Sequence, residues 1–109
     1  MNKKGIFKAK RKDNSTYYRV SITRNSKHIS LGSFDRQKDA AFCYMEAVEI
    51  FDNPNITVES YKDSFIIPFA KFIVLINYRD NGIYIANPIY LKSNYFYYYL
   101  DKDNVLKFD

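Results

Sequence analysis

The chain has 109 residues, enough for one domain or for one small domain with an extension, and its formal net charge is +5. The charge is uneven: residues 1–34 hold six Lys and three Arg against one acidic residue, whereas residues 52–109 hold six basic and seven acidic residues. This asymmetry is typical of a protein that binds a polyanion, and a merely solvated cationic surface is the alternative.

Three features of the sequence give no indication of a secreted or membrane-embedded chain. The single Cys43 cannot form an internal disulfide, and no apolar run follows the basic residues after Met1. The longest apolar stretch, residues 72–76, is far too short to span a membrane. We therefore expect a soluble, intracellular protein.

Residues 5–34 predict three strands. The segment 17–23 alternates apolar and polar side chains, as a sheet with one buried face requires. Polar turn residues at 12–15 and 24–27 separate it from its neighbours. The predicted strands lie at residues 5–11, 17–23 and 28–33.

A helix is predicted next, over residues 36–51. Ala40, Tyr44 and Ala47 recur at helical spacing, and Asp35 is the expected amino-terminal cap. Phe51-Asp52-Asn53-Pro54 is a stop signal. The predicted fold class is α+β, with a three-stranded antiparallel sheet packed on one helix and further antiparallel strands in the second half.

Residues 55–109 hold eight of the eleven Tyr and five of the nine Phe. Strands are predicted there at residues 66–68, 72–78, 83–86, 95–100 and 105–108, with turns at 80–82 and 101–104. Residues 61–65 are expected to be helical or irregular. The predicted organisation is a basic sheet-plus-helix unit at residues 1–54 and an aromatic-rich β extension at 55–109 that shares its core.

Residues 5–51 carry a familiar set of short motifs. They are Gly5-Ile6, the strand Tyr17-Tyr18-Arg19-Val20-Ser21-Ile22, the element Leu31-Gly32-Ser33-Phe34-Asp35, and Asp39-Ala40-Ala41 followed by Tyr44 and Ala47. This segment resembles an AP2/ERF-type DNA-binding domain of the kind found in integrases and homing nucleases. The resemblance implies a sheet whose face enters the DNA major groove.

The chain departs from that family at the DNA-contacting positions. It has no Trp, and Phe7, His28 and Ser30 stand where the family carries arginine or tryptophan. Met45 replaces an aspartate of the helix. The resemblance therefore implies the fold more strongly than any base contact, and no target sequence follows from it.

The predicted DNA-binding residues are the cations near the sheet and the small polar residues beside them. Cations on phosphates supply salt-dependent affinity, and Arg19 is placed to reach base edges. The full set is Lys4, Lys8, Lys10, Arg11, Lys12, Arg19, Ser21, Thr23, Arg24, Lys27 and His28.

Catalysis is not predicted. His28 is the only histidine, so a His-based metal cluster cannot be built, and the three glycines form no phosphate-binding loop. No nucleophile signature surrounds the serines. Asp101 and Asp103 are interpreted as turn formers. We expect no cofactor, no metal and no small-molecule substrate.

Two function classes remain. The first is a non-catalytic protein that binds duplex DNA, of phage or mobile-element origin. The second is a protein-binding module on an AP2-like scaffold, such as an anti-CRISPR-type inhibitor of a nucleic-acid-processing machine, which uses Tyr95, Tyr97 and Tyr99. That tyrosine run is equally consistent with core packing or with the edge of a homodimer.

Overall fold

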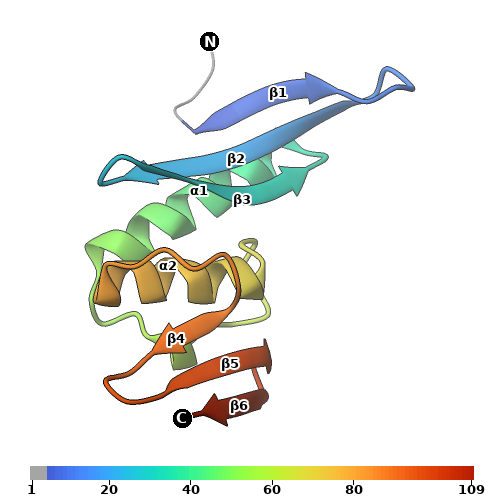
Figure 1. The fold of residues 1–109 in the computed structure, drawn as a ribbon. Coiled ribbons are helices and arrows are strands. Elements are labelled where there is room, and N and C mark those ends of the chain that lie inside the picture. The colour runs from blue at the N-terminus through green and yellow to red at the C-terminus, as the bar shows by residue number, and fades with distance from the viewer. Residues whose placement is uncertain (1–4) are drawn as a thin grey trace. The chain divides into compact units, whose positions relative to one another are not determined.

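The computed structural model describes residues 5–109, so the predicted contact Lys4 lies outside the described residues. The elements are β1 (Ile6–Lys10), β2 (Thr16–Arg24), β3 (Lys27–Phe34), α1 (Gln37–Asp52), the 3-10 helix η1 (Val58–Ser60), α2 (Phe69–Asn81), β4 (Ile89–Leu91), β5 (Phe96–Asp101) and β6 (Asn104–Phe108) (Figure 1). The α+β class is confirmed, as is an antiparallel three-stranded sheet packed against α1. Among residues 5–109, no helix is long and apolar enough to cross a membrane.

The chain divides into two units. The first runs to Val48 and includes Phe65–Ile67; the second comprises Glu49–Ser64 and Pro68–Asp109. Each unit contains one of the two sheets, β1-β2-β3 (sheet A) in the first and β4-β5-β6 (sheet B) in the second.

The core of the first unit follows from alternation on sheet A. Ile6 pairs with Val20 and Ile22 with Ile29, and all four side chains are buried. The register shifts between Val20 and Ser21, where Leu31 is the extra residue of β3 and is also buried.

Small side chains on α1 complete this core. Ala40 and Ala47 of the predicted stripe are fully buried, Tyr44 is half-buried, and Cys43, which the stripe did not include, is fully buried as well. The predicted cap Asp35 lies two residues before the first helical residue, and its carboxylate accepts a hydrogen bond from Arg11 at 2.6 Å.

Gly5 sets how closely α1 approaches the sheet. Its φ of 80° lies in the left-handed region, and its carbonyl accepts the Ser21 N–H at 2.9 Å. A Cβ at this position would lie 2.5 Å from the Ser21 oxygen and would overlap the ring of Tyr44. Both the backbone conformation and the available space therefore require glycine here.

Glu46 holds the segment Phe65–Ile67 against α1. Its carboxylate accepts the N–H groups of Ile66, at 3.0 Å, and of Ile67, at 2.8 Å. The prediction of a strand at 66–68 is wrong, because a side chain of the helix satisfies these N–H groups and Pro68 begins the next helix.

The second half differs most from the prediction. Residues 72–78, predicted as a strand, belong to α2, and Gly82 is its left-handed C-cap (φ 71°) with an N–H donated to Tyr78, not a hairpin turn. Every residue from Phe72 to Tyr78 is buried, so this helix shows no polar face from which a 3.6-residue period could be recognised. The predicted strand at 83–86 is absent from the described chain.

Sheet B matches the end of the chain as predicted and adds one strand. The expected strands at 95–100 and 105–108 correspond to β5 and β6, each displaced by one residue at one or both ends. Asp101 closes their turn by accepting hydrogen bonds from Asp103 N–H and the Asn104 amide, both at 2.8 Å. The short strand β4 was not predicted.

We predict that Gly5→Ala lowers the free energy of unfolding by about 3 kcal/mol, from left-handed strain plus overpacking against Tyr44. Gly82→Ala is the matched control: Gly82 also has positive φ, but nothing lies within 4 Å of an added Cβ. The control should lose only about 1 kcal/mol. Urea denaturation compares them, and equal losses would disprove the close-approach argument.

Cys43 should be inert in the folded protein. Burial, aided by the negative charge of Glu46, raises its pKa from 9.0 to about 12. Because the thiolate is the reactive form, the native thiol should react with Ellman's reagent at least about a thousandfold more slowly than in denaturing urea. Similar rates in the two conditions would show that the site opens readily.

Candidate functional site

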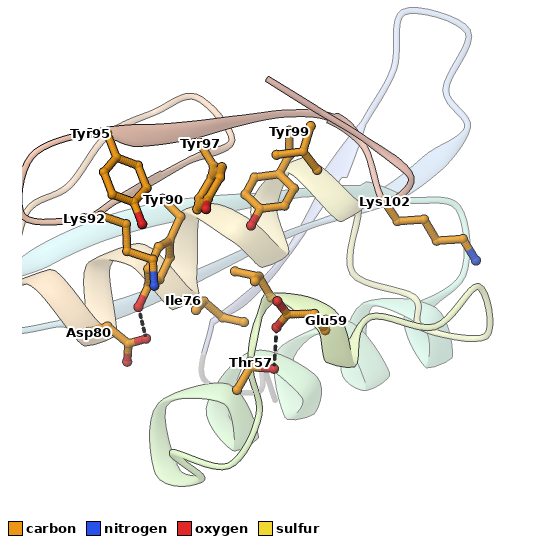
Figure 2. A pocket seen from close by; sticks show the side chains of 12 residues that line it. Thr57, Glu59, Ile76, Asp80, Tyr90, Lys92, Tyr95, Tyr97, Tyr99 and Lys102 are labelled. Carbon is orange, nitrogen blue, oxygen red and sulfur yellow. Dashed lines mark hydrogen bonds between the residues drawn. The ribbon is translucent and has the colours of Figure 1, made fainter. Parts of the chain in front are cut away.

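The second unit contains a cleft of about 530 Å³ lined by tyrosines (Figure 2). The lining comes from η1, α2, β4, β5 and the β5–β6 hairpin. Its tyrosines are Tyr90, Tyr95, Tyr97 and Tyr99.

Strand alternation brings the tyrosines to one wall. Tyr95, Tyr97 and Tyr99 are two residues apart, so they project from the same face, and Tyr97 pairs with Tyr90 of β4. The Tyr95 and Tyr97 rings meet edge to face at 5.5 Å, and Tyr97 and Tyr99 are 6.3 Å apart. Figure 2 shows the three hydroxyls pointing in a common direction, away from the strand.

A network around Arg79 fixes the end of the cleft formed by α2 and β4. The Arg79 side chain is only 11% exposed, and its Nη1 donates to the carbonyls of Ile50, at 2.8 Å, and Asn53, at 3.1 Å. Nε and Nη2 both donate to Asp80. Asp80 in turn accepts the Tyr90 hydroxyl at 2.8 Å.

The same contacts determine the protonation states of Asp80 and Tyr90. Burial raises the pKa of Asp80, but hydrogen bonds from Arg79 and Tyr90 outweigh it and the pKa is lowered overall. Burial, together with the hydrogen bond to Asp80, raises the pKa of Tyr90 to about 12. At neutral pH, therefore, Asp80 is an acceptor and Tyr90 its donor.

Asn77 connects α2 to β4 behind this wall. Its side chain is fully buried; Oδ1 accepts Leu91 N–H at 2.9 Å and an amide hydrogen of Asn81 at 2.8 Å, while Nδ2 donates to Ile83. The Asn81 amide also donates to the Leu91 carbonyl. Two helix side chains thus supply the hydrogen bonds that a neighbouring strand would give Leu91.

The remaining charged groups of the cleft are mixed in sign. Glu59 accepts the Thr57 hydroxyl at 3.0 Å. Lys92 lies with its ammonium 5.1 Å from the centre of the Tyr90 ring. Lys102 pairs with Asp63 at 3.1 Å and points away from the tyrosine row (Figure 2).

Two tyrosines of the row have raised pKa values. A hydrogen bond with Tyr95 raises the pKa of Tyr97, and burial together with the Glu59 charge raises that of Tyr99. The hydroxyls of Tyr97 and Tyr99 therefore stay protonated at physiological pH and can donate as well as accept hydrogen bonds.

The second candidate surface is the face of sheet A opposite the buried Ile6 and Val20. Register and alternation place on it Phe7, Ala9, Tyr17, Arg19, Ser21, Thr23, His28, Ser30 and Ser33. Ser21 is buried, Ala9 and Tyr17 are half-buried, and the other side chains are exposed. We call this set the open face.

The predicted cations are not all on the open face. Lys8 pairs with Tyr18 and Lys10 with Thr16, in phase with Ile6, so both project from the opposite face. Arg24 and Lys27 pair with each other, in phase with Ile22, so both also project from the face opposite the open face. Of the strand cations among the described residues, the register places only Arg19 on the open face.

Arg11 and Lys12 lie beyond the end of β1, in the connection to β2. The Arg11 guanidinium pairs with Asp35 at 2.6 Å and lies 4.8 Å from the centre of the Tyr17 ring. Its charge is thus partly neutralised. On the open face, the Thr23 hydroxyl and His28 Nδ1 are 3.3 Å apart.

Several residues of the two surfaces were not among the predicted site residues. Ser33 lies on the open face beside Ser30, which was named only as a departure from the family, and Glu59, Asp80, Tyr90 and Lys92 complete the cleft. The alternation Ile89-Tyr90-Leu91-Lys92 is the sequence signal that would have identified β4 and its tyrosine. No pattern in the local sequence relates Glu59 or Asp80 to the cleft.

Within residues 5–109, no cluster of three or more His, Cys, Asp or Glu side chains is arranged to hold a metal ion. Comparison with family models, curated proteins and solved structures found no match to the chain. The AP2-like resemblance therefore stays a proposal.

Tyr90→Phe tests the Asp80 contact. Below pH 10, the ordinary pKa of tyrosine, we expect the variant to be about 1 kcal/mol less stable, because Asp80 loses a donor. Between pH 10 and 12 the unfolded chain releases the Tyr90 proton while the folded chain keeps it, so the wild type loses this advantage as pH rises. Chemical denaturation across that range should show the difference shrinking; a constant difference would contradict the raised pKa.

Proposed function

We propose that the protein binds duplex DNA, without catalysis, through the open face of sheet A. The observation that carries the proposal is that this face presents a guanidinium among hydroxyl and imidazole groups on an exposed antiparallel sheet. β-Sheets that enter a DNA groove recognise it with such side chains. The AP2-like motifs of residues 5–51 support the same function.

Arg19 is the residue from which we expect the largest contribution. It lies on the central strand, between Phe7 on one side and Ser33 on the other. An arginine in this position donates two hydrogen bonds to guanine or binds a phosphate. Thr23, His28 and Ser30 add both donors and acceptors along the same face.

The other cations have a different role in this proposal. Lys8, Lys10, Arg24 and Lys27 project from the opposite face, but they lie on the edge strands or beside a hairpin, where long side chains reach phosphates at the rim of a groove. Their contribution would be independent of base sequence and sensitive to salt. Such a protein would act inside the cell, where duplex DNA is found.

A partner protein is the second candidate. The observation that favours it is the tyrosine-lined cleft, which lies in the part of the chain that has no excess of positive charge. Tyrosine is enriched among the residues that dominate protein interfaces.

Arg19→Ala should weaken binding to a short random-sequence duplex about tenfold and reduce the salt dependence of the affinity. Lys10→Ala removes the same charge from the opposite face and should have a smaller effect. Lys62→Ala, in the second unit, controls for net charge and should have almost none. Fluorescence anisotropy between about 50 and 200 mM salt provides the affinities and slopes.

Two outcomes would overturn the proposal. One is an affinity that does not fall as salt rises. The other is that Arg19→Ala binds as well as Lys62→Ala, which would leave charge alone, and not the open face, as the source of binding.

A further inference from the structure

We propose that the tyrosine-lined cleft binds a proline-rich segment of a partner protein, in the polyproline II conformation and carrying a basic side chain. This inference concerns a different site from the proposed DNA surface and does not depend on it. Three properties of the cleft lead to it: its hydrogen-bond donors beside aromatic rings, its charge and the length of its tyrosine row.

The first property is a set of hydrogen-bond donors beside the aromatic rings of the cleft. Tyr95 and Tyr99 present hydroxyls, and Lys92 presents an ammonium group. The Asp80 carboxylate already accepts hydrogen bonds from Arg79 and Tyr90. A ligand with accessible backbone carbonyls can accept hydrogen bonds from the Tyr and Lys groups.

Proline-rich backbone provides such carbonyls. Proline has no N–H, and the polyproline II helix makes no internal hydrogen bonds, so its carbonyls are free to accept. Aromatic-lined grooves that bind such segments work in this way, with rings packed against proline.

The second property is the charge of the cleft, which disfavours nucleic acid. Lys92 is accompanied by Asp80 and Glu59, and Lys102 is paired with Asp63. The ion pairs formed among residues 5–109 do not include Glu59. A carboxylate in that state repels phosphate and attracts an arginine or lysine of the ligand.

The third property is length. Tyr95 to Tyr99 covers four residue steps of an extended chain, or roughly 13 Å. A polyproline II segment rises about 3.1 Å per residue, so about four residues would contact all three rings. This segment is preformed, which lowers the entropy cost of binding.

The test uses the full chain, labelled with ¹⁵N, and three probes. The first is a short all-proline peptide, the second the same peptide with one arginine, and the third the arginine peptide with glycine replacing proline. We expect the amide signals of Glu59, Lys92 and residues 95–99 to shift with both proline peptides. The shifts should saturate at a lower concentration of the arginine peptide, because it binds more tightly. The glycine peptide should bind at least about fivefold more weakly.

Matched variants locate the site. Tyr95→Phe removes a donor and keeps the ring, and should weaken both proline peptides about fivefold. Tyr98→Phe, whose hydroxyl is on the other face of β5, should bind as the wild type does. Glu59→Gln should weaken the arginine peptide alone. All three keep the side-chain size, and the unchanged amide spectrum of each free variant verifies its fold.

Three results would overturn the proposal: no shift of the cleft amides at millimolar concentration of either proline peptide, equal binding of the glycine peptide, or loss of binding in Tyr98→Phe but not in Tyr95→Phe. A single-stranded oligothymidine is run in parallel. If it alone shifts the cleft amides, the ligand is a nucleic acid. The duplex affinity of the Arg19→Ala variant is independent of all these outcomes.

Discussion

The shape of the cleft depends on one nearly buried guanidinium. An arginine that is 11% exposed is costly unless its donors are satisfied, and Arg79 satisfies them with the Ile50 and Asn53 carbonyls and with Asp80. Those carbonyls lie at the carboxyl end of α1, where unpaired backbone oxygens favour a cation. The Arg79 side chain thus caps the carboxyl end of α1 and orients the Asp80 carboxylate, which holds Tyr90. Removing it would leave Asp80 without its main partner and Tyr90 without a fixed position.

Asn77 also fixes the position of one wall of the cleft, and it does so through hydrogen bonds without a charge. A fully buried amide is unfavourable unless both of its polar atoms are paired, and here Leu91, Asn81 and Ile83 supply the partners. The amide therefore fixes the position of β4 relative to α2. Since Tyr97 pairs with Tyr90 across sheet B, the tyrosine row of β5 is positioned by the same contacts. Sites held on regular elements in this way are more precise than sites on loops.

The sequence predicts the first unit well because each of its elements has one buried and one solvated side. Alternation identified all three strands of sheet A, and helical spacing identified α1. The same method failed for α2, since an entirely buried helix has no period and its Phe, Ile and Val residues have high strand propensity. With α2 assigned to a strand, Gly82 became a hairpin turn instead of a helix cap.

The candidate sites were predictable to different degrees for related reasons. Tyr95, Tyr97 and Tyr99 share a face in any strand, so their gathering follows from sequence alone. Asp80 and Glu59 reach the cleft from helices, and their contribution depends on packing that no local pattern encodes. On sheet A, counting cations indicated one basic surface, but alternation assigns Lys8 and Lys10 to the face opposite Arg19.

The placement of Arg19 and the lysines on opposite faces of sheet A has a consequence for the proposed binding of DNA. In the proposed DNA complex, a face with one strand guanidinium among small polar groups would offer few direct base contacts, and the cations of the opposite face and of the hairpins would contact phosphates. Affinity for DNA would then come mostly from charge, and discrimination between sequences mostly from Arg19. The exposed Phe7, which pairs directly with Arg19, adds an apolar surface suited to a thymine methyl group. Any sequence preference of this surface should therefore be narrow, restricted to the base pairs that Arg19 and Phe7 contact together.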